Sequence, residues 1–193
     1  MSHGFKSNYK TIYNVANINL FYPKNDKTSN PKIRIVHIST LDDAQKNISG
    51  ILRSIKQLWE KHSNFELQIV GDSPERSNLE KLAKDLGLYN KYVFFVGAKF
   101  KEELAELLRQ ADFLLMFSKY ENLPCVIIEA LASGIPVVSS RVGGIPEHIT
   151  EKTGILVEPK DEMGLTKAME WMLINHSTFD DTYLRKYAEE HFS

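Results

Sequence analysis

The sequence SKYENLPCVIIEALASGIPVVSSRVGGIPE, at residues 118–147, contains the segment that decides the fold. Within it, residues 125–132 are apolar except for Glu129. A helix that is apolar on all its faces is typical of the interior of a domain. An ionised carboxylate in such a place is costly unless another group pairs with it or hydrogen-bonds to it. The pattern therefore predicts a buried helix in which Glu129 is the residue to explain.

Strand and helix patterns alternate regularly on both sides of this segment. Short apolar, β-branched runs indicate strands, and apolar residues spaced three and four apart indicate helices. The predicted strands are 32–38, 65–70, 92–96, 112–117, 136–139 and 154–157, and the predicted helices are 48–59, 79–86, 102–110, 125–132, 165–174 and 183–192. Apolar strands that alternate with amphipathic helices favour a parallel sheet buried on both faces. The expected fold is α/β, a doubly wound Rossmann-like parallel sheet of about six strands with helices on both faces.

The composition is that of one globular domain, with 193 residues of which 42% are hydrophobic and 25% charged. The net charge of -1 gives no broad positive field, so neither nucleic acid nor an anionic membrane is expected as a major partner. No stretch approaches the ~18 apolar residues of a membrane span, so we expect a soluble protein. The single cysteine, Cys125, excludes an internal disulfide and favours the cytoplasm. We interpret its side chain as small, apolar and buried.

Residues 1–31 differ in character from the rest of the chain. They are rich in Asn, Lys and Pro, and a short apolar run at 11–15 predicts a small strand followed by a loop. We interpret 1–31 as a linker and 32–193 as the Rossmann-like domain. A polar and aromatic start of this kind leads us to expect that the chain is cut from a longer protein.

Sheets of this class bind ligands at the carboxyl ends of their strands, where loops run into helix starts. Pro124 suits the start of the helix at 125–132, whose N–H groups and positive dipole end favour a phosphate. Lys46, in the predicted loop after the first strand, is within reach of the same place, and a solvated surface lysine is the alternative. Gly143 and Gly144 follow a strand end, where they allow close approach to a ligand or a tight turn.

Several common kinds of site are not indicated. The sequence has neither a GxxxxGK[ST] phosphate loop nor a GxGxxG dinucleotide fingerprint, which weighs against an ATPase or a simple dehydrogenase. Its six histidines form no ligand pair at helical spacing, so no metal site is expected. There is no nucleophile elbow with a Ser/His/Asp arrangement.

Two glutamates remain, Glu121 just before the buried helix and Glu129 within it. A carboxylate is an acceptor with several lone-pair sites, so one beside a phosphate-binding helix start can take the two hydroxyls of a ribose. The second would meet a hydroxylated group on the far side of the phosphates. The arrangement suggests a sugar nucleotide as ligand.

These residues resemble a known family signature. Glu121 and Glu129, followed by residues 130–138 and by Gly143-Gly144, are similar to the E-x7-E region of the retaining glycosyltransferases of family 4. Further stretches resemble the same family and extend the match over nearly the whole chain, at 11–21, 69–88, 93–104 and 153–161.

The resemblance implies a protein of two Rossmann-like domains with the active site between them, the GT-B fold. This chain is similar to the C-terminal, donor-binding half, so the acceptor-binding N-terminal domain of the full-length chain is an implied partner. The family uses neither a metal nor a cofactor, and its donor is a nucleoside diphosphate sugar, here expected to be a UDP-sugar or a GDP-sugar. The helix start and Lys46 would then stabilise the departing diphosphate. No protein nucleophile is assigned.

The resemblance also implies roles for individual residues. Glu121, facing the donor sugar, and Lys46, neutralising the diphosphate, would be the catalytic pair, and Glu129 would bind the ribose hydroxyls. The other donor-binding residues would be Asn122, Leu123 and Cys125 at the diphosphate through their backbone N–H groups, Gly97, Ala98 and Lys99 beside the nucleobase, and Thr40, Gly71 and Ser118 at strand ends.

One position departs from the family pattern. Where the family commonly has an arginine in a G-R-L sequence after the first strand, this chain has Ser39-Thr40-Leu41. Thr40 therefore stands where a second phosphate-binding cation is expected. Either another basic residue such as Arg141 compensates, or diphosphate binding is weaker. A surface arginine is the plain interpretation of Arg141.

We therefore expect the donor-binding half of a retaining, metal-independent glycosyltransferase of the hexosyltransferase type, inactive in transfer by itself. Polysaccharide biosynthesis is the expected setting, in a cytoplasmic protein whose full-length form is peripheral to the inner membrane face. One alternative is a sugar-nucleotide-binding module without catalysis, and another is a sugar-nucleotide epimerase or phosphorylase of the same fold. A weaker one is a flavodoxin-like signalling domain, suggested by Asp42 and Asp43 near a strand end.

Overall fold

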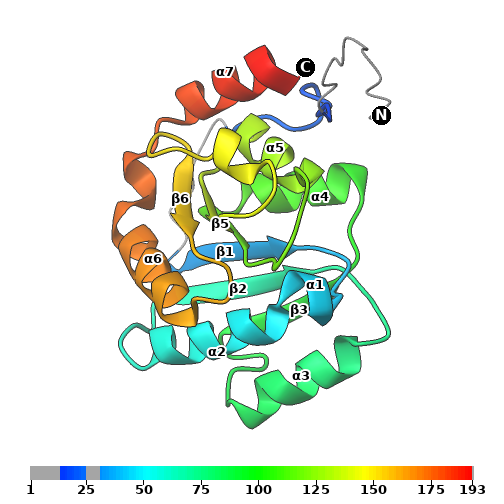
Figure 1. Cartoon of the computed structure of the whole chain (residues 1–193), viewed down its shortest axis with the longest axis vertical. Coiled ribbons are helices and arrows are strands. Elements are labelled where there is room, and N and C mark those ends of the chain that lie inside the picture. Colours follow the sequence, from blue (N-terminus) through cyan, green and yellow to red (C-terminus); the bar gives the residue numbers. More distant parts are fainter. Residues whose placement is uncertain (1–13, 25–30, 193) are drawn as a thin grey trace, which may run out of the picture.

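A six-stranded parallel sheet forms the centre of the molecule, in the order β3-β2-β1-β4-β5-β6 (Figure 1). The computed structural model describes residues 14–24 and 31–192. The strands are β1 (Ile33–Ile38), β2 (Phe65–Val70), β3 (Val93–Gly97), β4 (Phe113–Met116), β5 (Val137–Ser140) and β6 (Gly154–Val157). The predicted fold is confirmed, and each predicted strand agrees with the observed one to within one residue at either end.

Helices cover both faces of the sheet (Figure 1). They are α1 (Asp43–Lys46), α2 (Ile48–Trp59), α3 (Arg76–Asp85), α4 (Lys101–Arg109), α5 (Cys125–Ala132), α6 (Glu162–Asn175) and α7 (Asp181–Phe192), with 3-10 turns η1 (Ile145–Glu147) and η2 (His176–Thr178). Side chains of α2, α3 and α6 belong to one hydrophobic core, and those of α4, α5 and α7 belong to the other. In the described part of the chain, none of these helices is both long and apolar enough to cross a membrane.

The helix α2 shows how the sequence dictates this packing. Ile48, Ile51, Leu52, Ile55 and Leu58 are fully buried, and they recur at the spacing of one helical face. Burying each such side chain contributes roughly 1.5–3 kcal/mol. The stripe therefore fixes which side of α2 lies on the sheet.

The loop predicted after β1 is in part helical. Asp42 caps α1, because its Oδ1 accepts a hydrogen bond from the Gln45 N–H at 3.2 Å. Asn47, with a φ of 54°, ends α1 and is followed directly by α2. Lys46 is thus the last residue of a helix, and the prediction that it lies in a loop was wrong. The predicted strand at 11–15 lies largely outside the described residues, and Asn14 and Val15 have no strand structure.

Residues 14–24, predicted as part of a linker, pack onto the domain. The Ala16 N–H donates to the Phe192 carbonyl oxygen at 3.0 Å, and the Phe21 side chain is buried in the core beside α5 and α7. Arg185 of α7 donates to the carbonyl oxygens of Phe21 and, at 2.9 Å, of Ile18. This segment is therefore held by hydrogen bonds and by apolar burial.

The sheet reverses its winding between β1 and β4, which is where a doubly wound sheet offers a ligand crevice. The two strands pair over only two steps, Ile35 with Phe113 and Val36 with Leu114. By contrast, β1 and β2 pair along the full length of both strands. The loops after β1 and β4 therefore begin side by side at the carboxyl edge of the sheet.

Candidate functional site

Charged and polar side chains meet at the carboxyl ends of β1 and β4. Lys46 Nζ lies 2.5 Å from Glu121 Oε1, and these side chains are only 12% and 8% exposed. Ser118 Oγ donates to the same carboxylate oxygen at 2.8 Å. Gln45 Nε2 donates to the Tyr120 carbonyl oxygen at 3.3 Å, which ties α1 to the loop after β4. The structure thus brings together three predicted residues, with Lys46 and Glu121 paired to each other.

The helix α5 begins beside this cluster and presents free amides. Pro124 is its N-cap residue and makes no side-chain cap. Within residues 14–24 and 31–192, the backbone N–H groups of Asn122, Leu123 and Cys125 donate to no acceptor. Unbonded N–H groups at a helix start, beside a lysine, favour an anion.

Two of the eight residues of α5 are not buried. Cys125 is exposed, so its interpretation as a small buried residue was wrong. The reason is its place at the first turn, which opens toward the carboxyl edge rather than into the core. Glu129 is half-buried, and burial raises the pKa of its carboxyl group. No described group hydrogen-bonds to this carboxylate or pairs with it, so it would gain free energy from hydroxyl donors.

Gly143 and Gly144 pack against the loop between β4 and α5. A Cβ on Gly143, whose φ is 55°, would lie 1.9 Å from the carbonyl oxygen of Glu121. The Gly144 N–H donates to the Asn122 carbonyl oxygen at 2.8 Å. The loop after β5 therefore supports the loop that carries Glu121, and only glycine fits at residue 143.

The backbone segments at the carboxyl ends of β1, β2 and β3 also lie in close contact with one another. A Cβ on Gly71 would lie 1.8 Å from the Ser39 carbonyl oxygen, and the Gly71 N–H donates to the Gly97 carbonyl oxygen at 3.0 Å. Ala98 is exposed, and Lys99 Nζ pairs with Glu103 Oε1 at 2.8 Å. β3 is three strands away from β4, or about 14 Å at the usual strand spacing. Residues 97–99 are thus not brought to Glu121 but line the far end of the same edge.

Thr40 and Arg141 do not form part of the charged cluster. Thr40 is exposed on the loop after β1. Arg141 Nε pairs with Glu158 Oε1 at 3.1 Å, and both side chains are more than half exposed. Compensation for Thr40 by Arg141 is therefore not supported, because this guanidinium is engaged in a surface ion pair.

The sequence of the chain matches one protein family along most of its length. The match to the family described as "Glycosyl transferases group 1" covers residues 21–191. The chain belongs to this family.

Individual relatives agree with the assignment. N-acetyl-alpha-D-glucosaminyl L-malate synthase of Bacillus anthracis is 31% identical over 165 residues, which are 81% of this chain and 42% of that protein. The chain thus spans less than half the length of this relative. Sucrose-phosphate synthase from Thermosynechococcus elongatus has a TM-score of 0.83 at 28% identity, covering 93% of this chain and 47% of that one. Anabaena HepE, solved with UDP and glucose, has a TM-score of 0.83 at 22% identity, covering 95% and 53%.

One buried histidine of this group 1 glycosyltransferase domain connects the two central strands, β1 and β4, and it was not singled out from the sequence. His37 is fully buried in β1, where its Nδ1 lies 2.9 Å from the Leu115 carbonyl oxygen of β4. Its Nε2 lies 2.8 Å from Ser39 Oγ. Burial lowers the pKa of His37 to about 4, so the ring is neutral near pH 7. The signal in the sequence was a polar residue inside the otherwise apolar run IVHI.

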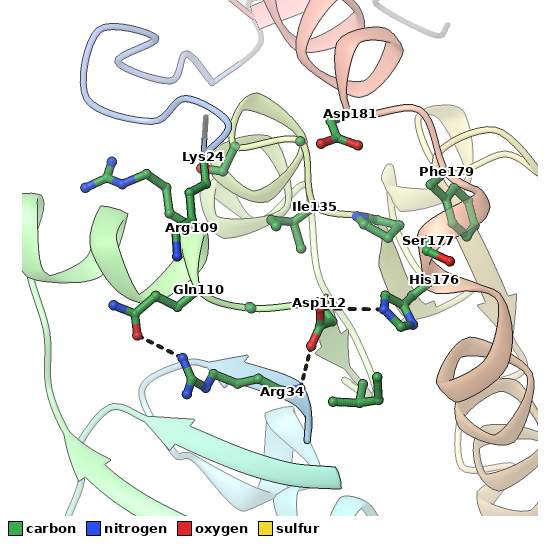
Figure 2. Close-up of a pocket in the computed structure, with 15 residues that line it drawn as sticks. Lys24, Arg34, Arg109, Gln110, Asp112, Ile135, His176, Ser177, Phe179 and Asp181 are labelled. Carbon is green, nitrogen blue, oxygen red and sulfur yellow. Dashed lines mark hydrogen bonds and ion pairs between the residues drawn. The ribbon is translucent and has the colours of Figure 1, made fainter. Parts of the chain in front are cut away.

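A cavity of about 590 Å³ lies at the opposite, amino edge of the sheet. Figure 2 shows Arg34, Gln110, Asp112 and His176 around it. These groups already bond to one another: Arg34 Nη1 donates to Gln110 Oε1 at 2.8 Å, and Asp112 accepts from the Arg34 N–H at 2.7 Å. The cavity thus has its charges largely satisfied and is separate from the Lys46–Glu121 cluster. Among the described residues, no three His, Cys, Asp or Glu side chains are placed to hold a metal ion.

Replacing Gly143 by alanine should destabilise the domain, because the new methyl group would collide with the backbone of Glu121. We expect a loss of about 3 kcal/mol in the free energy of unfolding, measured by urea denaturation. The control is Gly87→Ala, which has a similar positive φ of 74° but no atom within 4 Å of the added Cβ. It should lose only about 1 kcal/mol. Equal losses in the two variants would contradict the close packing at residue 143.

Acid should destabilise the domain through His37. The imidazole pKa is 6.5 when unfolded and about 4 when folded. As the pH falls from 7 to 4, the unfolded chain therefore takes up a proton that the folded chain does not, and stability decreases. The two pKa values imply a loss of about 3 kcal/mol. Urea unfolding of the parent and of His37→Gln at pH 7 and pH 4.5 tests this, since the variant should lose less; parallel losses would refute it.

Proposed function

We propose that this chain is the donor-binding half of a retaining, metal-independent glycosyltransferase of family 4 that takes its sugar from a nucleoside diphosphate. The observation that carries the proposal is the set of three unbonded N–H groups at the start of α5, beside Lys46 and two acidic side chains. Amide donors and a lysine suit a diphosphate, and carboxylates suit the hydroxyl groups on either side of it.

The proposed ligand lies along the carboxyl edge from β3 to β4. Its base borders Gly97, Ala98 and Lys99, and its ribose hydroxyls donate to Glu129. The diphosphate then accepts hydrogen bonds from the free amides at the start of α5. The donor sugar reaches Glu121. HepE was solved in complex with UDP and glucose, and a nucleoside diphosphate and a sugar are the two parts of the donor proposed here.

The ion pair between Lys46 and Glu121 has a consequence for this proposal. The diphosphate must share Lys46 with the Glu121 carboxylate, or take it over. Glu121 keeps other donors in that case, because Ser118 Oγ bonds to Oε1 at 2.8 Å and Gln45 Nε2 lies 3.5 Å from Oε2. Lys46 can therefore turn to the phosphates while Glu121 remains fixed toward the sugar.

In the proposed reaction, Lys46 and the amides at α5 stabilise the charge that develops on the departing diphosphate. A second domain supplies the acceptor site and excludes water, so this chain by itself should bind donor and transfer nothing. We place the whole protein in the cytoplasm, peripheral to the inner membrane face, as a transferase of polysaccharide synthesis. A sugar-nucleotide-binding module without catalysis remains the second candidate, because Thr40 leaves one expected cation missing.

A panel of UDP-, GDP- and ADP-sugars, titrated calorimetrically, should show one preferred nucleotide. Glu129→Gln should weaken its binding by about tenfold or more, because a charge-assisted acceptor for the ribose is lost. Glu151→Gln is the control, since it removes the same charge from an exposed loop before β6. Equal affinity in the parent and in Glu129→Gln would remove Glu129 from the ribose site.

The same titrations should depend on pH. Hydroxyl donors favour the ionised form of Glu129, whose pKa burial has raised, so affinity should fall as the pH drops through that raised value. The Glu129→Gln variant should lack this part of the dependence.

Restoring the missing cation should strengthen diphosphate binding. Thr40 is exposed, so Thr40→Arg adds a guanidinium without disturbing the core. We expect about tenfold tighter UDP binding from a new charge-assisted hydrogen bond, measured by calorimetry at low and at high salt. Thr182→Arg, exposed on α7, is the matched control and should leave affinity unchanged. The same gain in both variants would point to net charge instead of a local contact.

A further inference from the structure

The backbone pairing of β1 with β4 ends before the strands do, and beyond it a side chain hydrogen-bonds from one strand to the other. Backbone pairing between these strands ends at Val36 and Leu114. At the next step, the His37 ring reaches across and its Nδ1 meets the Leu115 carbonyl oxygen at 2.9 Å. On its other side, His37 still pairs with Ile69 of β2. The histidine thus bridges the gap that opens between the two strands at the switch point.

The direction of each hydrogen bond at this bridge is fixed by chemistry. The carbonyl oxygen of Leu115 can only accept, so Nδ1 of the neutral ring holds the proton and Nε2 is an acceptor. Ser39 Oγ lies 2.8 Å from Nε2 and therefore donates to it. The same hydroxyl oxygen accepts the Leu41 N–H at 3.1 Å. A single chain of three hydrogen bonds thus runs from the Leu41 amide to the backbone of β4.

This chain of bonds holds a loop in an unusual conformation. Leu41 has a φ of 56°, in the left-handed region that a leucine rarely adopts, and its side chain is fully buried. Its carbonyl oxygen accepts a hydrogen bond from Ser73 Oγ at 3.1 Å. The next residue, Asp42, caps α1, which ends at Lys46. On the β4 side, Leu115 is followed closely by Ser118, which bonds to Glu121.

We infer that His37 is a positioning residue that sets the separation of the two segments that follow β1 and β4 and bear Lys46 and Glu121, and so the width of the donor diphosphate site. The inference rests on the proposed function. His37 acts through Ser39 and through Leu115, and it does not touch the ligand, because the ring is fully buried and both of its nitrogens are engaged.

The test removes the Ser39 hydroxyl from this series of hydrogen bonds and compares the effect with the loss of a serine hydroxyl elsewhere in the domain. Ser39→Ala removes the link to Leu41 and leaves the bond between His37 and Leu115. The matched control is Ser54→Ala, since the Ser54 hydroxyl, like that of Ser39, makes an internal hydrogen bond: it donates to the Glu162 carbonyl oxygen at 3.2 Å, between α2 and α6. Thermal unfolding, hydrogen exchange of the Leu41 amide and calorimetric UDP affinity are measured on both variants.

We expect similar decreases in melting temperature for the two serine variants. Only Ser39→Ala should speed exchange of the Leu41 amide and weaken UDP binding, by about tenfold for the lost hydrogen bonds. His37→Gln, whose side-chain oxygen can still accept from Ser39, should recover affinity that His37→Leu loses. Recovery separates positioning from general stability, because both replacements disturb the core.

Two results would overturn the inference. If the parent binds UDP and Ser39→Ala binds it as tightly as Ser54→Ala, the bridge does not position the site, while the proposed function stands. If the parent binds no nucleoside diphosphate or its sugars, the proposed function fails and the inference fails with it.

Discussion

The short pairing between β1 and β4 is the constraint on which the rest of the site depends. Two steps of backbone pairing, Ile35 with Phe113 and Val36 with Leu114, hold the two halves of the sheet together. Beyond this pairing the winding of the sheet reverses. The chain after β1 leads to a helix on one face of the sheet, and the chain after β4 leads to a helix on the other face. The polar residues of the cluster stand on the segments that follow these two strand ends, on α1 after β1 and on the loop after β4.

The loops themselves are held by contacts between backbones. Gly71 lets the chain after β2 lie against the Ser39 carbonyl group, and Gly143 lets the chain after β5 lie against that of Glu121. Side chains can change rotamer, but two backbone segments in van der Waals contact move only together. The geometry at the carboxyl edge is therefore a property of four strands acting as one unit.

The fold could be predicted almost completely from the sequence, because apolar periodicity reports burial directly. The positions of the loops that form the candidate site also followed, since these loops begin at the strand ends. The pairing of Lys46 with Glu121 and the bond between His37 and Leu115 did not follow, because each joins residues more than seventy positions apart through tertiary geometry. Cys125 was misjudged because hydrophobic neighbours do not reveal which way the first turn of a helix faces. The short helix α1 had a readable signal, an aspartate three residues before a glutamine.

Arg185, which ties residues 14–24 to the domain, also contacts α5. Its guanidinium donates to the Ala132 carbonyl oxygen, at the C-terminal end of that helix, at 3.1 Å. The eight residues of α5 span about 12 Å. The guanidinium, which also pairs with Glu189 Oε1 at 2.6 Å, thus lies as a hydrogen-bond donor at the negative pole of the helix. At the other end, the amides of residues 122, 123 and 125 have no hydrogen-bond acceptor in the described part of the chain, so the positive pole there is open to an anion.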